Sequence, residues 1–576
     1  MAHQRVLLLS FIWLLFPELV LSKSKRDSWN SAFSTSNLTT CRCFPGDECW
    51  PTYSQWNEFN LTVGGRLIAT VPLAAPCHGD LYNATECTRI RAAWHDPAIH
   101  IQSSSSITAP GFANLSCDPF LPREDRCIVG TYVRYAVDAR SVSDYKTVLQ
   151  FATTHNIRLV IRNTAHDFLG KSTGAGALAL WTHNLKNIDV LDYEKSYYRG
   201  KALKVSAGIQ LFEAYQTAHD HGLTIVGGTC PTVGLAGGYT QGTGHGLAAS
   251  KLGFGADQAL EWEVMTVDGD ILLATPQENT DLYWALSGGG GGTYGIVVSL
   301  TIKAHPDRRT AAANLTWTNE GISQDTFYDA IQQYIAILPT VLDAGGNSNW
   351  LNSNDTFQMS PAVGFGMSKE EIDILHEPLL RYLDDLVISY SYYSADFPTY
   401  LDMYNAMNPP YETAEYQIGS RLIPRTVIVE KAEAFTAALR RIAAHGTWIS
   451  GVSFNVSRLP TVPNSVNPAF RSSSVSLVIG TVYNSFDQAQ NLMNQELMTN
   501  TLVPTLAELI PRGGHAYLNE GDPFEPNWQQ VFYGDNYPRL LKIKEKYDPR
   551  HVLYGRTAVG SEVWIEMADG RLCRQR

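Results

Sequence analysis

Hydrophobic and polar positions alternate along the first half of the chain in a pattern that predicts strands separated by helices. Residues 131–137 and 157–163 are strand-like, and residues 141–156 between them have a capping serine and helical spacing. This order predicts a β-α-β unit. Strand-like runs at 202–208 and 223–228, on either side of a helical segment, predict a second unit of the same kind.

A hairpin and a long strand follow these units. Residues 261–275 form two apolar runs around Asp268-Gly269, a dipeptide that favours a tight hairpin turn. Residues 294–306 are predicted to form a strand that Pro306 ends, because proline cannot donate a ladder hydrogen bond.

Beyond residue 307 the pattern mixes helices with strands, as in an α+β layer. Helices are predicted at 326–337, 369–387 and 429–445, and a strand at 474–483. We expect residues 308–514 to form a substrate domain. In the last segment, 515–576, a helix is predicted at 536–549, and its Leu540, Leu541 and Ile543 are expected to pack back on the first domain.

The amino-terminal part of the chain, residues 1–122, has a different pattern. His3 and Arg5 precede an apolar run at 6–16 that is too short to span a bilayer, and small Ser22 follows it. Residues 1–22 are therefore predicted to be a signal peptide, the alternative being an uncleaved anchor. Residues 23–122 are expected to be a loop-rich, cysteine-rich extension.

Glycosylation signals support passage through a secretory lumen, so the protein is expected to be secreted or lumenal, with no membrane contact after signal cleavage. The seven Asn-x-Ser/Thr sequons are at Asn37, Asn60, Asn83, Asn114, Asn314, Asn354 and Asn455.

Composition narrows the class of protein. The chain has 576 residues, enough for two or three domains. Because 44% of the residues are hydrophobic, the chain is not expected to be disordered along its whole length. Its 44 basic and 56 acidic side chains give a net charge of −12, and no basic run offers a surface for nucleic acid.

Cysteines are concentrated near the amino terminus. Seven of the nine lie before residue 130, Cys573 lies near the far end, and Cys230 stands alone. In an oxidising compartment the crowded set predicts a disulfide framework rather than a metal site. If Cys230 has another task, the other eight can form four bridges, one of them tying the carboxyl terminus to the extension.

Three glycine-dense stretches follow predicted strands, at 163–176, 227–246 and 288–297. Glycine lets backbone amides approach a ligand closely, and successive amides form a nest for a pyrophosphate. A dinucleotide fingerprint that opens a helix, with an acidic residue about 20 positions later, is missing, so a nicotinamide cofactor is disfavoured.

These segments carry a resemblance. Four segments together resemble the vanillyl-alcohol-oxidase superfamily, in its berberine-bridge-enzyme-like branch and fungal secreted form. They are the sequences around His166 and Cys230, the run GGGGGTYGIV and the tail FYGDNYPRLLKIKEKYDPRHVLYG. The resemblance covers about residues 123–565. It implies an α+β fold with a two-subdomain PCMH-type FAD-binding domain at 123–307 and a large antiparallel sheet in the substrate domain.

The resemblance also implies bicovalent FAD. The histidine matching His166 is joined to the 8α-methyl of the flavin, and the cysteine matching Cys230 to its carbon 6; the alternative is two structural side chains. No metal is expected. Besides these two, the residues expected to bind the cofactor are Asn163, Thr164, Ala165, Asp167, Gly170, Gly228, Thr229, Val233, Gly234, Gly237, Gly238, Gly242, Gly244, Gly295, Ile296 and Val297.

Two departures from the family pattern stand out. Ala165 takes the place of a glycine, and Gly237-Gly238-Tyr239 lacks a histidine that plant members have, for which Tyr239 or His245 is a candidate substitute. Val233 matches a position where valine resembles members that react with dioxygen, so an oxidase is favoured over a dehydrogenase.

Glu520 is the first candidate for the general base and Tyr517 the second, in a segment that resembles a family strand reaching the active site. Both are alternatively structural polar residues at a domain seam. Arg421 is given no role beyond lining the substrate side.

The sequence thus predicts a flavoprotein oxidase that takes two electrons from an alcohol, amine or natural-product carbon and reduces dioxygen to hydrogen peroxide. Secondary-metabolite biosynthesis is one candidate role for such an enzyme. One alternative is a carbohydrate oxidase with a groove of stacking aromatics, for which Tyr390, Tyr392, Tyr393 and Tyr400 are candidates. Another is a glycosylated binding protein whose flavin is vestigial.

Overall fold

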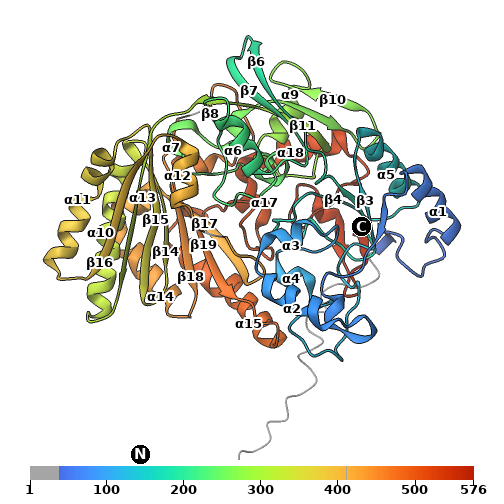
Figure 1. The fold of residues 1–576 in the computed structure, drawn as a ribbon, viewed down its shortest axis with the longest axis horizontal. Helices are drawn as coiled ribbons and strands as arrows, with labels where there is room; N and C mark the ends of the chain where they lie inside the picture. The colour runs from blue at the N-terminus through green and yellow to red at the C-terminus, as the bar shows by residue number, and fades with distance from the viewer. Residues whose placement is uncertain (1–37, 410, 459, 576) are drawn as a thin grey trace, which may run out of the picture.

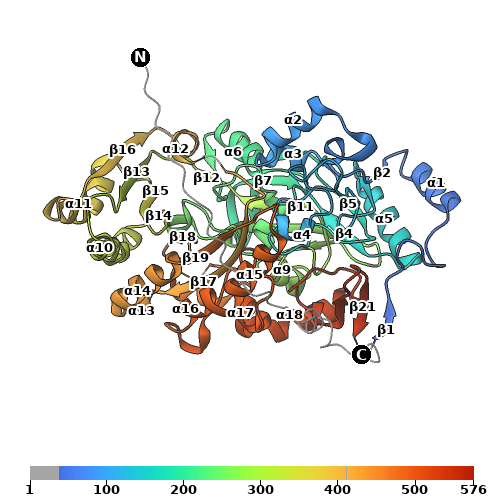
Figure 2. The ribbon, with the colours of Figure 1, turned by 90° about the horizontal axis from the view of Figure 1, so that it is seen from below.

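A computed structural model describes residues 38–409, 411–458 and 460–575. The predicted signal peptide and the sequon at Asn37 lie outside these residues. The chain forms two halves, with the carboxyl-terminal segment running back along the first (Figures 1 and 2). Among the described residues, none of the helices is both long and apolar enough to cross a bilayer.

The first sheet contains the predicted β-α-β unit. Helix α5 connects two strands that both pair in parallel with a third strand between them, so the prediction is confirmed with one strand inserted. In sheet order the strands are β2 (Leu67–Ala69), β3 (Tyr135–Asp138), β5 (Leu178–Trp181) and β4 (Leu159–Arg162), and α5 is Val142–Thr154. Strand β2 belongs to the amino-terminal extension and adds an antiparallel edge.

The second sheet is antiparallel and includes the predicted hairpin, whose turn has Gly269 at φ +88°. In sheet order its strands are β10 (Ile271–Ala274), β9 (Ala259–Met265), β11 (Ile296–Lys303), β7 (Tyr198–Ser206) and β6 (Ile188–Lys195). Helices beside it are α6 (Leu211–His219), α7 (Ala249–Leu252), α8 (Gly255–Gln258) and α9 (Thr280–Leu286).

The second predicted β-α-β unit is correct in its first strand and its helix, which are β7 and α6, but wrong in its last strand. Of residues 223–228 only Leu223–Thr224 form a strand, β8, and it pairs antiparallel with β12 (His305–Pro306) outside the main sheet. The predicted strand at 294–306 is correspondingly two strands, β11 and β12. Ile225 and Val226 are buried in a loop, and a short apolar run does not distinguish a buried loop from a strand.

The second half is built on a seven-stranded antiparallel sheet, as predicted (Figure 1). In order its strands are β16 (Tyr390–Phe397), β13 (Thr310–Thr318), β15 (Thr356–Phe365), β14 (Asn347–Asn352), β18 (Trp448–Ser453), β19 (Ser473–Val482) and β17 (Tyr416–Pro424). Its helices are α10 (Gln324–Asp343), α11 (Lys369–Asp385), α12 (Tyr400–Met407), α13 (Arg425–Glu430), α14 (Ala432–Ala443), α15 (Gln488–Leu497) and α16 (Val503–Ala507).

Strand alternation decides which face of this sheet is covered by helices. On β13, Ala311 and Ala313 belong to the core shared with α10, α11 and α14, whereas Ala312 between them belongs to the core of the first half. The sheet therefore separates a helical outer layer from the rest of the molecule. The predicted helix at 429–445 is two helices, α13 and α14, that meet at Lys431.

The amino-terminal extension is more helical than expected. Thr52 and Asn83 cap two ten-residue helices, α1 and α2, whose amphipathic spacing is weak. Its other elements are short. The elements are β1 (Leu38–Cys41), α1 (Tyr53–Thr62), α2 (Ala84–Ala93), α3 (Pro97–Ile101) and α4 (Pro110–Ala113).

Four disulfides confirm the predicted framework. The pairs are Cys41–Cys573, Cys43–Cys49, Cys77–Cys87 and Cys117–Cys127, and Cys230 is a free, buried thiol. The Cys41–Cys573 bridge ties the two ends together, next to the pairing of β1 with β21.

The carboxyl-terminal segment returns to the first half, as expected: Leu540 and Ile543 lie in the core of the second sheet, and Leu541 packs against it. Its elements are α17 (Trp528–Tyr533), α18 (Tyr537–Tyr547), β20 (Trp564–Glu566) and β21 (Leu572–Gln575). Single turns of 3₁₀ or π helix lie at Ala75–Cys77, Gly79–Leu81, Leu235–Tyr239, Pro468–Ser472, Met498–Leu502, Pro511–Gly513, Gly534–Asn536 and Ser561–Val563.

Candidate active site

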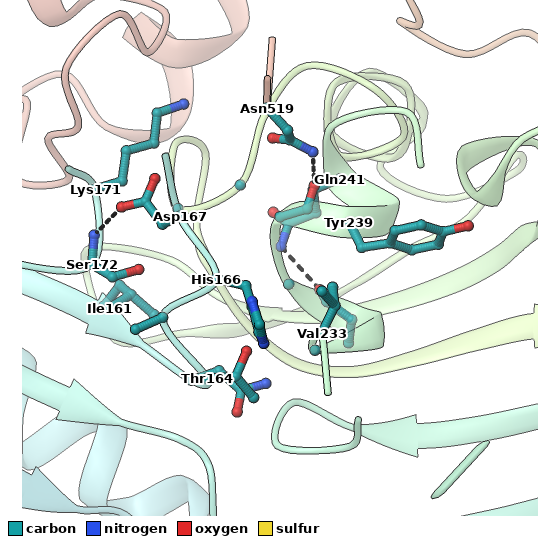
Figure 3. Close-up of a pocket in the computed structure, with 18 of the residues that line it drawn as sticks. Ile161, Thr164, His166, Asp167, Lys171, Ser172, Val233, Tyr239, Gln241 and Asn519 are labelled. Atoms are coloured by element: carbon teal, nitrogen blue, oxygen red, sulfur yellow. Dashed lines mark hydrogen bonds between the residues drawn. The ribbon is translucent and has the colours of Figure 1, made fainter. Parts of the chain in front are cut away.

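A cavity of about 280 Å³ lies where the glycine-rich loops of the first half meet the carboxyl-terminal segment. Its walls come from the loop after β4, the loop that contains Cys230, the π-helical turn Leu235–Tyr239, the loop before β11 and residues 517–520. Segments far apart in the sequence therefore meet around one space (Figure 3).

His166 lies in the loop that leaves β4. The preceding Ala165 has φ +62°, a left-handed conformation that costs an L-residue about 1–2 kcal/mol. The Thr108 hydroxyl donates to the Ala165 carbonyl at 2.9 Å, and the Ala165 methyl is buried in a cluster with Trp94 and Ile107 of the extension. The extension thus holds the backbone in the conformation that a glycine would adopt more easily.

Cys230 faces His166 across the cavity wall. Its Sγ lies 3.9 Å from His166 Nε2, and the Thr232 hydroxyl lies 2.7 Å from that nitrogen and 3.4 Å from the sulfur. Both side chains line the cavity. Two residues separated by 64 positions are thus brought to one edge of one space.

Burial sets the protonation states of this pair. Burial lowers the pKa of His166 to about 4, so its imidazole is neutral at physiological pH and carries a free lone pair. Burial also raises the pKa of Cys230, which keeps it a thiol. Of the two nucleophiles, the imidazole is the one that needs no deprotonation.

A basic side chain, His245, and an acidic one, Glu520, both line the cavity. His245 Nε2 lies 3.1 and 3.3 Å from the two carboxylate oxygens of Glu520, and both side chains are mostly buried. The predicted base is therefore not isolated but paired with an imidazole. Residues 515–520 form an irregular loop and turn, so the family strand expected there is wrong.

Tyr517 lies beside this pair. Its ring centroid is 5.0 Å from that of His245, and its hydroxyl oxygen accepts hydrogen bonds from the Gly244 N–H at 3.3 Å and Asn519 Nδ2 at 2.8 Å. Burial, with the Glu520 charge second, raises the pKa of Tyr517. The phenol is therefore protonated and can donate its hydrogen to a ligand.

Bare backbone forms the wall opposite His166. A Cβ added at Gly237 or Gly292 would meet no atom within 4 Å, and at Gly238 it would meet only Asn519 Oδ1 at 3.9 Å. Asn519 Nδ2 donates to the Gly238 carbonyl at 2.8 Å, and Gln241 Nε2 to the Ala236 carbonyl at 3.0 Å (Figure 3). Such a wall admits a flat ligand close to the main chain, which fits an isoalloxazine ring.

Most of the predicted site residues line the cavity. These are His166, Cys230, Asn163, Thr164, Ala165, Asp167, Gly228, Thr229, Val233, Gly234, Gly237, Gly238, Gly295, Val297, Tyr517 and Glu520.

Four predicted residues do not line the cavity: Gly170, Gly242, Gly244 and Ile296. Gly170 and Gly244 are turn glycines with φ +73° and +69°, and Gly242 packs on the Asn519 amide. The Ile296 side chain points into the core of the first sheet. Glycine density identifies the loops but not which of their residues face the ligand.

Several lining residues were not among the predicted site residues. They include Lys171, Ser172, Gln241, Gly291, Gly292, Tyr411, Asn519, Tyr554 and Gly555. Lys171 and Ser172 follow a glycine of the first glycine-rich loop, a signal available from the sequence. Tyr411 lies in no glycine-rich motif; its ring is 5.7 Å from that of His166.

The tyrosines expected to form a sugar-binding groove are elsewhere. Tyr390, Tyr392 and Tyr393 lie on β16, an edge strand of the seven-stranded sheet, and Tyr400 is buried against Tyr215 and Tyr404. None of them lines the cavity. That interpretation of the tyrosines is wrong, because their spacing is that of a strand edge and a helix core.

Among the described residues, one cluster has the composition of a metal site, formed by Cys43, Asp47 and Cys49. The two cysteines are joined in a disulfide, so they have no thiolate to offer a metal.

Comparison with protein-family models matches two segments of the chain. An FAD binding domain matches residues 133–275, and a domain described as "Berberine and berberine like" matches residues 516–560. Both segments contribute lining residues to the cavity.

Relatives match over almost the whole chain. The chain is 50% identical over 542 residues to the FAD-linked oxidoreductase sor8 of Hypocrea jecorina, which covers 94% of both chains. It is similar to the crystal structure of the VAO-type flavoprotein MtVAO615 from Myceliophthora thermophila C1, with a TM-score of 0.88, 38% identity and coverage of 93% of this chain and 100% of that one.

A more distant structure shares the fold. The glucooligosaccharide oxidase of Acremonium strictum, with a 6-S-cysteinyl, 8α-N1-histidyl FAD, is 18% identical with a TM-score of 0.63, covering 74% of this chain and 92% of that one.

Proposed function

This chain belongs to the FAD-linked oxidoreductases of the berberine-bridge-enzyme-like branch of the vanillyl-alcohol-oxidase superfamily, and from that membership we propose that it is a secreted oxidase with doubly attached FAD. The observation that carries the proposal is the convergence of His166 and Cys230, 3.9 Å apart, on a cavity that also contains Glu520 and Tyr517.

His166 and Cys230 would hold the flavin at the edge of its dimethylbenzene ring. With Nε2–H donating to the Thr232 hydroxyl at 2.7 Å, the lone pair on Nδ1 is the free one, the nitrogen that is linked in the glucooligosaccharide oxidase. The buried thiol of Cys230 lies next to the same imidazole. The neutral state of His166 and the bare glycine wall are the features of this chain that fit the ring.

When bound, FAD supplies a two-electron acceptor for hydride. Glu520 would take the proton of the substrate's hydroxyl or amine, and His245 at 3.1 Å would hold that carboxylate in place and share its charge. Tyr517 would donate a hydrogen bond to the substrate heteroatom, because its own oxygen already accepts from Gly244 and Asn519.

The proposed overall reaction oxidises an alcohol, amine or natural-product carbon and reduces dioxygen. For an alcohol, one C–H and one O–H hydrogen leave the substrate to give a carbonyl, and the two electrons and two protons convert dioxygen into hydrogen peroxide. Val233 lines the cavity, which is consistent with a role in dioxygen access. A carbohydrate is not favoured, because the tyrosines invoked for it lie away from the cavity.

Four disulfides among the described residues and the predicted signal peptide support secretion. Among relatives, the bifunctional decalin synthase calF of Penicillium decumbens is 38% identical over 550 residues. A place in secondary metabolism is therefore part of the proposal.

The test is the attachment pattern of the flavin. Denatured wild-type protein should keep its yellow colour, and mass spectrometry should find flavin on the peptides of His166 and Cys230. Cys230→Ala should retain the histidyl link alone, and His166→Ala should retain less flavin. Release of all flavin on denaturation would contradict the attachment, and a substrate panel that yields product without peroxide would contradict the oxidase assignment.

A further inference from the structure

We propose that a second cavity of about 110 Å³, next to the active-site cavity, binds the non-reacting part of the substrate, and that this part is an uncharged ring with a hydrogen-bond donor. The proposal rests on the oxidase function given above, for which it names a substrate class. Binding to the second cavity can be measured without turnover, so the two proposals can fail separately.

The second cavity lies where the amino-terminal extension meets the second half of the molecule. Its walls come from α4, the first residues of β17, the residue that follows β19, helix α15 and the turn at Pro523 and Phe524. Helix α4 packs against β17, and α15 packs against β19 (Figures 1 and 2). Segments that are distant in the sequence therefore enclose this space as well.

Two segments connect this cavity to the catalytic groups. Phe168, two residues after His166, lines both cavities. Glu520 lines the first cavity, and Pro523 and Phe524, a few residues later, line the second. The second cavity therefore adjoins the catalytic end of the first, where the non-reacting part of a substrate would lie.

The walls of the second cavity are uncharged. None of the described side chains that line it is acidic or basic, and its two tyrosines, Tyr416 and Tyr483, stay protonated because burial raises the pKa of each. The first cavity, by contrast, contains Asp167, Lys171 and Glu520. A charged ligand would lose its hydration in the second cavity without gaining an opposite charge, so these walls favour an uncharged ligand.

Aromatic rings form much of the wall. Phe112, Phe168 and Phe524 line it together with the two tyrosines. The Arg556 guanidinium lies 5.8 Å from the ring centroid of Phe112 and 5.2 Å from that of Phe524, which helps to hold both rings in place. Phe524 is 40% exposed and Leu492, also on the wall, is 59% exposed, so the cavity opens to solvent beside apolar surface that a ligand ring would cover.

Gln417, on β17, supplies a polar group to the wall. Its Oε1 atom is buried and has no hydrogen-bond partner among the described residues. A buried amide oxygen without a donor is costly, and the terminal torsion of glutamine is soft, so the amide can turn its oxygen toward a donor in the cavity. The Gln417 amide therefore favours a hydroxylated ring over a bare hydrocarbon.

The experiment measures binding of fluorinated probes to the flavin-loaded, full-length protein by fluorine NMR. 4-Fluorophenol is an uncharged ring with a donor, 4-fluorotoluene lacks the donor, and 4-fluorobenzoate carries a charge. Gly111→Leu should fill the cavity, because Gly111 lines it and an added Cβ would meet no atom within 4 Å. Gln417→Leu removes the amide, and Phe524→Ala removes one ring.

Two control variants make the same changes elsewhere. Gln490→Leu and Phe486→Ala replace the same residue types at exposed positions that line neither cavity. Both should bind every probe as the wild type does.

Wild-type protein should bind 4-fluorophenol at least about 10-fold more tightly than 4-fluorobenzoate. Phe524→Ala should weaken 4-fluorophenol binding by about 3- to 10-fold, because it removes one ring contact. Gln417→Leu should weaken it by a similar factor and leave 4-fluorotoluene binding unchanged, because only the phenol donates to the amide. Gly111→Leu should abolish binding of both uncharged probes.

Equal affinity for 4-fluorophenol and 4-fluorobenzoate would overturn the proposal, as would 4-fluorophenol binding that Gly111→Leu and Phe524→Ala leave unchanged. Among alcohols that the enzyme oxidises, those with an uncharged ring should show a KM that Phe524→Ala raises more than it lowers kcat; an unchanged KM would overturn the substrate role. If no alcohol yields peroxide while the variants change probe binding as expected, the oxidase function fails and the binding site is supported.

Discussion

Substitution of Glu520 is the most direct test of the proposed chemistry. Its carboxylate is held by His245 at 3.1 Å, and the neighbouring Tyr517 stays protonated because burial raises its pKa. A protonated phenol can donate a hydrogen bond but is a poor proton acceptor, so the proposal gives the role of general base to Glu520 and that of donor to Tyr517.

We expect Glu520→Gln to lower kcat by about 10²- to 10⁴-fold, the usual worth of a general base, because the amide keeps the shape but cannot accept the proton. The flavin absorption spectrum and the flavin-to-protein ratio should not change. Glu508→Gln, at an exposed position, is the matched control. A Glu520→Gln enzyme with wild-type turnover and pH profile would rule Glu520 out.

At the scale of elements, the loop after β4 depends on the disulfide-bonded extension. Arg162, at the end of β4, donates to the Ser103 carbonyl at 2.9 Å and to the Ser106 carbonyl. Thr108 then donates to the Ala165 carbonyl at 2.9 Å, one residue before His166. The extension therefore positions the histidine rather than only covering the domain.

Thr108→Val should remove this hydrogen bond and destabilise the protein by about 1 kcal/mol, because the Ala165 carbonyl loses the hydroxyl that donates to it. Since Ala165 then has less to hold its left-handed conformation, the fraction of chains with flavin on His166 should fall. Quantitative mass spectrometry of the flavopeptides measures that fraction. Thr147→Val removes a hydroxyl that bonds only within its own helix, so this variant should leave the fraction of chains with flavin on His166 unchanged.

At the scale of the whole molecule, the carboxyl-terminal segment joins the two halves. Asp522 in this segment is 1% exposed and accepts hydrogen bonds from Gln495 Nε2 at 3.0 Å and Thr499 Oγ1 at 2.6 Å, both from the second half. Arg421, for which only a substrate-side position was expected, instead forms a buried ion pair with Glu525 at 2.7 Å. The seam next to the cavity is therefore polar and buried.

This seam gives the stability a pH dependence. Burial raises the pKa of Asp522 from 3.8 to about 6, so the folded state holds this proton more tightly than the unfolded chain. The contribution is therefore largest below pH 4 and is lost as pH rises to about 6, by up to about 3 kcal/mol.

Denaturant melts at several pH values measure this effect. Between pH 4 and 6, Asp522→Asn should show a smaller loss of stability with rising pH than the wild type, whereas the exposed Asp385→Asn should match the wild type. If wild type and Asp522→Asn have parallel profiles, Asp522 does not titrate in this window.

The sequence by itself determined what depends on local pattern and on residue identity. It predicted the β-α-β unit, the Asp268-Gly269 hairpin, the disulfide framework and the FAD family, because periodicity, turn preferences, cysteine number and motif residues are all present along the chain. It also placed His166 and Cys230 in glycine-rich loops that follow strands.

Tertiary structure decided what depends on distance in space. The pairing of His245 with Glu520 joins residues 275 positions apart, and Thr108 reaches Ala165 across 57 positions. The short strand β8 and the separation of β12 from β11 follow from one pairing, between Leu223–Thr224 and His305–Pro306, which forms a sheet of its own. Lys171 follows a glycine in the sequence, but its place on the cavity wall against Gly555 is decided by the return of the carboxyl-terminal segment, because a contact between segments so far apart leaves no local pattern in the chain.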